Sequence, residues 1–279
     1  MPTTFVFCNQ KGGVGKTTSV VNLSYLISCK GLKVLSIDLD PQGNLTSGLG
    51  IDKLSLLKSM YNVIVGGLKL DECIIENIYD NLDIVPSLPS LAGAEIELVS
   101  QVGREYQLRE KISELGKNYD AILIDCPPSL GLLTVNALAA ADYLIIPLQC
   151  EYYALEGLGQ LLTTFKLVKT KLNRNLEIGG IIPTMADMRT NLTTQVIDDV
   201  RKHFGEKVFK TVIQRSVKIS EAPSFGKPVV VYAKESKGAL NHQELSKEFL
   251  ARFYPNWEKS KQSEKPAAAE PSEKQEQLT

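Results

Sequence analysis

A segment rich in glycine, lysine and threonine at residues 9–18 has the composition of a phosphate-binding loop. It reads Asn-Gln-Lys-Gly-Gly-Val-Gly-Lys-Thr-Thr and lies between a strand pattern and a helical pattern, which is the setting of a P-loop. Its three glycines let the main chain wrap around an anion, so that amide hydrogens point at phosphate oxygens beside a helix N-terminus. Lys16 is expected to reach the β and γ phosphates, Thr17 to supply a hydroxyl ligand to Mg²⁺, and Thr18 to donate to the α phosphate. The nucleotide-binding residues expected from this pattern are Gly12, Gly13, Val14, Gly15, Lys16, Thr17 and Thr18.

The segment departs from the usual P-loop spacing in one respect. Gln10 occupies the position where the first glycine of the pattern should be, and an additional lysine, Lys11, follows it. The strand and helix on either side still make an incidental glycine-rich turn the less favoured interpretation.

Two acidic segments follow apolar runs and are expected close to the loop. The run 121–124 ends in Asp125, which is the Walker B pattern, and the carboxylate would hold Mg²⁺ through a water. A second run, 34–37, is followed by Asp38 and Asp40. An acidic residue just past a strand end lies beside the phosphate loop in a parallel sheet. The same two aspartates also suit a turn before the next proline, so the residues alone leave both interpretations open.

Short apolar runs alternate with helical patterns along the chain, which predicts an α/β fold with a mainly parallel twisted sheet and helices on both faces. Several runs are continuously apolar, so their strands should be buried on both faces. The expected strands are Thr3–Cys8, Lys33–Ile37, Leu82–Val85, Ala121–Ile124, Tyr143–Pro147, Ile178–Pro183, Val208–Ile213 and Val229–Val231. The expected helices are Thr17–Ser28, Arg104–Leu115, Leu130–Ala140, Leu155–Leu172, Thr193–His203 and Gln243–Phe253.

Composition favours one globular domain over residues 1–257. The chain has 279 residues, of which 43% are hydrophobic and 23% charged, and α/β folds of this length are often single units. Residues 258–279 change to Lys, Glu, Ser, Gln, Pro and Ala, which predicts a disordered polar tail. No run approaches the roughly eighteen apolar residues of a membrane span, and no signal peptide is evident, so we expect a cytoplasmic protein.

The cysteines argue against a metal site, and the net charge argues against attraction of nucleic acid by the molecule as a whole. The five cysteines are scattered and form no CxxC pair, which favours buried free thiols over a metal site. They are Cys8, Cys29, Cys73, Cys126 and Cys150. A formal net charge of −1 means that any contact with nucleic acid must come from a local basic patch.

Together, several motifs resemble one family, the ParA/Soj partition ATPases, which carry a deviant Walker A loop of the form Lys-Gly-Gly-x-x-Lys-Thr. The resemblance extends over residues 4–254. Its motifs are Asp-Pro-Gln-Gly-Asn at 40–44, Leu-Ala-Gly-Ala-Glu at 91–95, Asp-Cys-Pro-Pro-Ser-Leu-Gly at 125–131, Gln-Cys-Glu-Tyr-Tyr-Ala-Leu-Glu-Gly at 149–157, Arg-Thr-Asn-Leu at 189–192 and Ser-Glu-Ala-Pro-Ser at 220–224.

The resemblance implies a function and roles for single residues. MgATP would drive formation of a homodimer that binds DNA without sequence preference, and a ParB-type centromere-binding partner would stimulate its slow hydrolysis, so that the protein associates with the nucleoid. Lys11 would reach across the dimer to the phosphates of the other subunit, where a second cation would stabilise developing charge. Asp40 would position or activate the attacking water. Lys11, Lys16 and Asp40 are therefore the expected catalytic residues.

Basic residues point to the DNA contacts that the resemblance implies. Residues 201–218 contain six basic residues and one acid, which also suits an ordinary solvated face. By resemblance, Arg189 and Lys218 would contact DNA, and Lys202, within the basic run, is the third expected contact. Gln214 and Ser216 stand where relatives have proline and asparagine beside the adenine edge, so this chain departs from the family at its base contacts.

Three alternatives compete with the partition ATPase. A MinD-type division-site ATPase would need an amphipathic C-terminal helix that binds membrane, and residues 259–279 show no such stripe. An iron–sulfur reductase of the nitrogenase iron-protein type would need a second cysteine near Cys126. A scaffold that binds nucleotide without hydrolysing it is the third.

Overall fold

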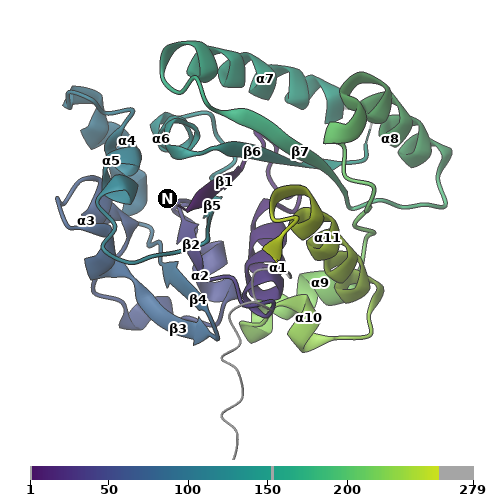
Figure 1. The fold of residues 1–279 in the computed structure, drawn as a ribbon, viewed down its shortest axis with the longest axis horizontal. Helices are drawn as coiled ribbons and strands as arrows, with labels where there is room; N and C mark the ends of the chain where they lie inside the picture. Colours follow the sequence, from purple (N-terminus) through teal and green to yellow (C-terminus); the bar gives the residue numbers. More distant parts are fainter. Residues whose placement is uncertain (1, 152–153, 258–279) are drawn as a thin grey trace, which may run out of the picture.

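The computed structural model describes residues 2–151 and 154–257. Its centre is a seven-stranded sheet with the order β3-β4-β2-β5-β1-β6-β7, in which only the pairing of β3 with β4 is antiparallel (Figure 1). The strands are β1 Thr3–Phe7, β2 Val34–Asp38, β3 Ile75–Tyr79, β4 Leu82–Val85, β5 Ala121–Asp125, β6 Tyr143–Gln149 and β7 Glu177–Thr184. The predicted α/β class with a mainly parallel sheet is confirmed.

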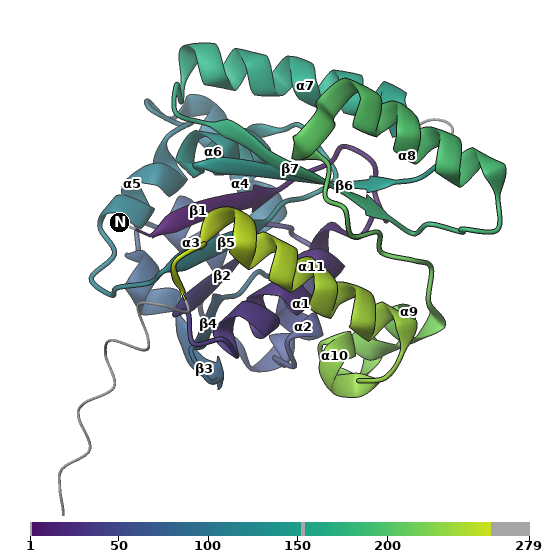
Figure 2. The ribbon, with the colours of Figure 1, turned by 45° about the vertical axis from the view of Figure 1, so that its right-hand side comes forward.

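Helices cover both faces of the sheet because side chains alternate along each buried strand. In β1, Phe5 and Phe7 belong to the apolar core with α1 and α11, whereas Val6 packs into the opposite core. Figure 2 shows α1 and α11 side by side on one face, with α6, α7 and α8 grouped away from them. The helices are α1 Lys16–Ser28, α2 Asn44–Gly48, α3 Met60–Ile64, α4 Leu91–Glu97, α5 Gln107–Ser113, α6 Leu132–Ala140, α7 Ala154–Lys171, α8 Asn191–Phe204, α9 Val217–Glu221, α10 Val229–Tyr232 and α11 Lys237–Phe253.

Two of the predicted strands are wrong. Residues 208–213 follow the edge of β7 and donate to it from the amides of Phe209 and Ile213. No strand forms between these two points, because the amides of Lys210 and Thr211 donate to the carboxylate of Glu248 instead. Residues 229–231 belong to α10, which follows Pro228. Val229 and Val230 pack there in a small core of their own, so this β-branched run is buried without a partner strand.

Strand β3 was not predicted, and it is an irregular strand. It lies at the edge of the sheet with a shifted register, and Asn77 within it has a left-handed backbone at φ 54°. The helix predicted at residues 104–115 is shorter than expected, and α5 spans Gln107–Ser113. The last helix, α11, begins six residues earlier than predicted. The short helices α2, α3, α4, α9 and α10 were also missed.

The cysteines are free, and four of them are buried as predicted. The prediction is wrong for Cys29, which is exposed at the end of α1. The predicted disordered tail at 258–279 lies outside the described residues.

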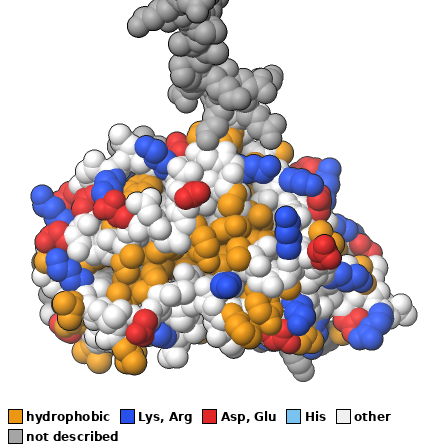
Figure 3. Space-filling model, turned by 90° about the horizontal axis from the view of Figure 1, so that it is seen from below, with side chains coloured by type: hydrophobic (Ala, Val, Ile, Leu, Met, Phe, Trp, Pro, Cys, Tyr) orange, Lys and Arg blue, Asp and Glu red, His pale blue; other side chains and the backbone are white. Residues whose placement is uncertain are grey.

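One face of the molecule carries both hydrophobic and charged side chains. Seen from below, hydrophobic side chains gather across the middle of this face, while basic and acidic side chains are interspersed around its edge (Figure 3). Charge of a single sign therefore does not dominate this face, in line with the formal net charge of −1. Within residues 2–151 and 154–257, none of the helices has the length and apolar character needed to cross a bilayer.

Candidate functional site: a phosphate-binding loop with buried carboxylates

The glycine-rich loop joins the central strand β1 to α1, as the sequence predicts. Gly13 and Gly15 have φ of 72° and 89°, the left-handed region that side chains disfavour. Gly15 is the residue before the first turn of α1, and no side chain caps this turn. The amides at the start of this 13-residue helix therefore point toward the loop with the positive end of the helix dipole, which is the arrangement that binds an anion.

Hydrogen bonds from neighbouring strands hold the loop in this shape. The side chain of Asn9 donates to the carbonyl of Pro147 at 2.8 Å and accepts from the Lys11 amide at 3.1 Å. On the other side, the Thr184 hydroxyl donates to the Val14 carbonyl at 2.7 Å. The ends of β6 and β7 thus fix the loop before any ligand arrives.

Lys16 is the buried cation of the site. Its side chain is only 6% exposed, and its Nζ donates to the carbonyl of Lys11 at 3.1 Å across the loop. No acid forms an ion pair with it among the described residues. The loop opens into a cavity of about 420 Å³, and the predicted residues that line it are Gly12, Gly13, Gly15, Lys16, Thr17, Thr18 and Asp40.

Three aspartates meet beside the loop, at the carboxyl ends of neighbouring strands. Asp38 and Asp125 are register partners in β2 and β5, and both are fully buried. Asp38 accepts from the amide and hydroxyl of Thr46 at 2.8 and 2.7 Å and from the Asp40 amide at 3.2 Å. Burial raises the pKa of Asp38 to about 6, although these hydrogen bonds act in the opposite direction. Asp38 therefore holds the loop that carries Asp40.

Asp125 and Thr17 suit a divalent cation. Neither carboxylate oxygen of Asp125 has a hydrogen-bond partner among the described residues. Burial raises the pKa of Asp125 well above its usual range and nearby Asp38 raises it further, whereas Thr17 and Lys16 lower it. A buried, unpaired carboxylate next to a hydroxyl is a donor set that Mg²⁺ prefers, so these residues fit the expected metal site.

Asp40 lies at the edge of the cavity with its carboxylate fixed. It is 7% exposed, and one of its oxygens accepts from the Gln42 amide at 2.9 Å. Gly43 at the following turn has φ 61°, and a Cβ there would lie 2.8 Å from the Ser87 carbonyl oxygen. Glycine is therefore required at this turn, and the turn directs Asp40 toward the phosphate loop.

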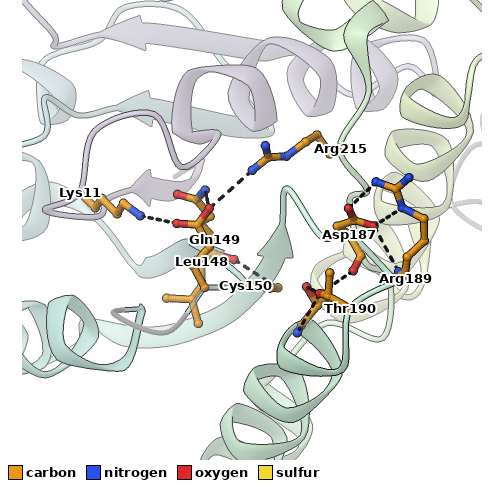
Figure 4. Close-up of polar contacts among 10 residues, drawn as sticks. Lys11, Leu148, Gln149, Cys150, Asp187, Arg189, Thr190 and Arg215 are labelled. Atoms are coloured by element: carbon orange, nitrogen blue, oxygen red, sulfur yellow. Dashed lines mark hydrogen bonds and ion pairs between the residues drawn. The ribbon is translucent and has the colours of Figure 1, made fainter.

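Lys11 points away from the cavity of its own chain. Its Nζ lies 3.0 Å from a carboxylate oxygen of Glu151, at the end of β6, and its side chain is 44% exposed. Arg215 approaches the same carboxylate at 3.5 Å from the opposite side, and Figure 4 shows Lys11 and Arg215 pointing toward each other. Lys11 is not among the residues that line the 420 Å³ cavity.

A second cavity of about 230 Å³ adjoins the first, because both are lined by Gly15 and Thr18. Gln214 and Ser216, the predicted base contacts, lie in its wall. The Gln214 amide donates to the side chain of Asn241 at 3.1 Å, which ties this segment to α11. The wall also includes His242, which the sequence did not single out, because a lone histidine in a helical pattern gives no signal of its own.

Two of the three predicted DNA contacts, Arg189 and Lys202, lie near opposite ends of α8. Arg189 precedes α8 and Lys202 lies near the end of this helix, so at 1.5 Å per residue they are separated by roughly 15 to 20 Å. Arg189 is 89% exposed, yet both oxygens of Asp187 accept from its guanidinium, which lowers the pKa of Asp187 to about 2 (Figure 4). Lys218, on α9, pairs with Glu221 at 2.8 Å.

Comparisons with known proteins agree with this geometry. A family model described as an AAA domain matches residues 3–178. The chain is 53% identical to the sporulation initiation inhibitor protein Soj of Bacillus subtilis over 243 residues, which are 87% of this chain and 96% of the relative. It is 48% identical to the chromosome-partitioning ATPase Soj of Treponema pallidum over 252 residues, which are 90% of this chain and 98% of the relative.

A solved structure shares the fold. It is cobyrinic acid a,c-diamide synthase from Mycobacterium smegmatis with a bound ATP analogue and magnesium, at a TM-score of 0.80 and 35% identity, covering 91% of this chain and 96% of that chain. One assignment follows from the motifs, from the loop geometry and from the relatives, which match over nearly their full length. This chain belongs to the ParA/Soj family of chromosome-partitioning P-loop ATPases.

Proposed function

We propose that this chain is an ATP-driven DNA-partition switch, in which MgATP joins two copies into a form that binds DNA. The chain is a member of a family of ATPases, and its loop and carboxylates fit ATP and Mg²⁺. The observation that carries the switch is the position of Lys11. This exposed cation sits beside the phosphate loop but outside its own cavity, so a second copy can receive it.

Each residue of the site has a distinct part in hydrolysis. The loop amides and Lys16 bind the β and γ phosphates and neutralise their charge. Thr17 and Asp125 would hold Mg²⁺, which when bound offsets phosphate charge during transfer. Asp40 orients the attacking water from the rim of the cavity, and Lys11 of the other copy stabilises charge on the γ phosphate.

DNA binding follows from joining two weak basic surfaces. Each copy presents Arg189, Lys202 and Lys218, and the dimer doubles the number of phosphate contacts, so DNA affinity rises through avidity. A ParB-type partner stimulates hydrolysis and returns the protein to the weakly binding form. A titration of a non-specific duplex with ATP, ADP and no nucleotide tests this proposal. Equal affinity in all three conditions would contradict it.

The Lys11→Ala variant is expected to bind ATP as a monomer but to lose the ATP-dependent dimer. The side chain points away from its own cavity, so its removal costs little nucleotide affinity within one chain. Sedimentation velocity with ATP under conditions that block hydrolysis measures the dimer, and calorimetry measures nucleotide binding. Lys166→Ala, which removes an exposed lysine on α7, is the matched control and should dimerise normally. Normal dimerisation of Lys11→Ala would refute the cross-subunit role.

Reversing the charge at Arg189 is expected to weaken DNA binding for all sequences alike and to leave ATP affinity unchanged. Arg189→Glu should reduce the slope of log affinity against log salt by about 0.9 for each DNA phosphate that the protein no longer neutralises. Arg174→Glu alters the net charge equally at another exposed arginine and should have little effect. Asp187→Asn frees Arg189 from its ion pair and should strengthen binding. A weakening that depends on DNA sequence would argue against backbone contacts.

A further inference from the structure

The carboxylate of Glu95 lies against the backbone of Gly131. Glu95 belongs to α4, Gly131 immediately precedes α6, and these two helices pack against each other. A Cβ at Gly131 would lie only 2.9 Å from Cδ of Glu95 and 3.2 Å from its Oε2, and it would overlap Oε1. The carboxylate of Glu95 therefore fills the space that a side chain at residue 131 would need.

Lack of space, and not backbone conformation, requires glycine at residue 131. Gly131 has φ −78° and ψ −171°, which is extended backbone open to any residue. Gly13 and Gly15 of the phosphate loop differ from it, because their positive φ itself favours glycine. The close fit between Glu95 and Gly131 is thus a specific contact between α4 and the start of α6.

The packing of α4 does not explain the position of Glu95. The helix is held by Leu91, Ala94 and the following Leu98, which are fully buried. Oε1 of Glu95 is buried without a hydrogen-bond partner, and Glu95 forms no ion pair, within the part of the chain that the structure describes. A buried oxygen without a partner is unfavourable. The contact with Gly131 is what the carboxylate provides in return.

The electrostatics of α6 favour the same contact. This helix of nine residues has no capping side chain and no acidic residue in its first turn. A carboxylate near the N-terminus of a helix interacts favourably with the helix dipole. Glu95 supplies this negative charge from a neighbouring helix, so both charge and shape hold it beside Gly131.

The loop that ends at Gly131 also carries groups of the phosphate site. It spans residues 126–131 and directly follows Asp125 at the end of β5. In its middle, Pro128 lines the 420 Å³ cavity and packs beside Gly12, where a Cβ would lie 3.8 Å from the Cβ of Pro128. The sheet fixes the start of this loop, and the contact with Glu95 fixes its end. A shift at the end of the loop would therefore move Pro128 relative to a bound phosphate.

We propose that Glu95 is a positioning residue for ATP hydrolysis, which acts through Gly131 to hold the 126–131 loop against the phosphate site. The inference rests on the hydrolysis proposed above. Glu95 is not among the residues that line the 420 Å³ cavity, so its loss should lower turnover and leave nucleotide affinity unchanged. Misplacement of a group by about 1 Å can slow a reaction on the order of a hundredfold, so a small movement of the loop is sufficient.

Phosphate release at a series of MgATP concentrations, with non-specific DNA present, measures kcat and KM. Glu95→Ala should lower kcat about tenfold or more, with KM within about twofold of wild type. Gly131→Ala should have the same effect, because its methyl group displaces the carboxylate. The double variant should be no slower than Glu95→Ala alone, since the methyl group then meets no carboxylate. Glu97→Ala removes an equal charge from an exposed position of α4 and should hydrolyse as wild type does.

The outcomes separate this proposal from the proposed function. Wild-type turnover in a folded Glu95→Ala protein would overturn the role of Glu95, and so would losses that multiply in the double variant. A rise in KM that accounts for the whole loss would overturn it as well, because Glu95 would then act on binding. Thermal unfolding shows which variants are folded. If one single variant does not fold, the other still decides against Glu97→Ala. A wild-type protein without any ATP hydrolysis would refute the proposed function itself, and the role of Glu95 with it.

Discussion

Replacing Lys16 by alanine is expected to abolish measurable ATP binding, with a loss of affinity on the order of a hundredfold or more. Lys16 is buried at the loop, its Nζ is held by a single backbone carbonyl, and no acid neutralises it among the residues that the structure describes. A phosphate can therefore form an ion pair with Lys16 directly. Without this cation the β and γ phosphates would enter a buried site that holds three aspartates, and repulsion would oppose binding.

Calorimetry with ATP and Mg²⁺ measures this effect. Lys30→Ala is the matched control, because it removes an exposed lysine just beyond the other end of α1 and should leave affinity unchanged. Thermal unfolding of both variants without nucleotide shows whether the fold is intact. A folded Lys16→Ala protein that retained wild-type affinity would show that the loop amides alone hold the phosphates.

Replacing Asp40 by alanine is expected to slow hydrolysis by between about a hundredfold and ten-thousandfold while ATP still binds. Asp40 lines the cavity from its rim, whereas the groups that hold phosphate come from the loop. The variant should therefore accumulate as an ATP dimer on DNA. Phosphate release, measured with DNA and with the ParB-type partner, gives the rate, and co-sedimentation with DNA gives the bound fraction.

One further variant separates the charge of Asp40 from its structural contact, and a second serves as a control. Asp40→Asn retains an oxygen that can accept from the Gln42 amide, so the loop should keep its shape while the carboxylate charge is removed. This variant should hydrolyse as slowly as Asp40→Ala. Asp80→Ala, at the exposed turn between β3 and β4, should behave as wild type. Full activity of Asp40→Asn would exclude the carboxylate as the group that activates water.

The pH dependence of folding should reflect His242 in the absence of nucleotide. Its pKa of about 4 lies below the ordinary value of 6.5, so the unfolded chain binds the proton more readily. The contribution of the neutral ring to stability is therefore complete above about pH 6.5 and is lost as the pH falls toward 4. Denaturant titrations of wild type and His242→Gln across this window should show a steeper loss in wild type. If the stabilities of the two proteins fell equally with pH, the assignment of His242 as a buried neutral ring would be wrong.

The sequence by itself determined the phosphate loop and the fold class. Residues 9–18 are consecutive between a strand and a helix, so the groups that bind phosphate are neighbours along the chain and their pattern is recognisable without distant contacts. The position of Asp125 beside Thr17 could also be predicted, because the carboxyl ends of parallel strands meet at one edge of the sheet. Continuous apolar runs similarly predicted the buried central strands β1, β2, β5 and β6.

The tertiary structure alone decided which distant groups meet. Lys11 pairs with Glu151, 140 residues further along the chain, and His242 joins the wall of a cavity shared with Thr18. The sequence of residues 208–213 predicts a strand, but the carboxylate of Glu248 accepts hydrogen bonds from two of their amides. Periodicity encodes local conformation and the burial of a face, whereas pairings of this kind arise from packing and from competition among hydrogen-bonding groups that only the folded chain brings together.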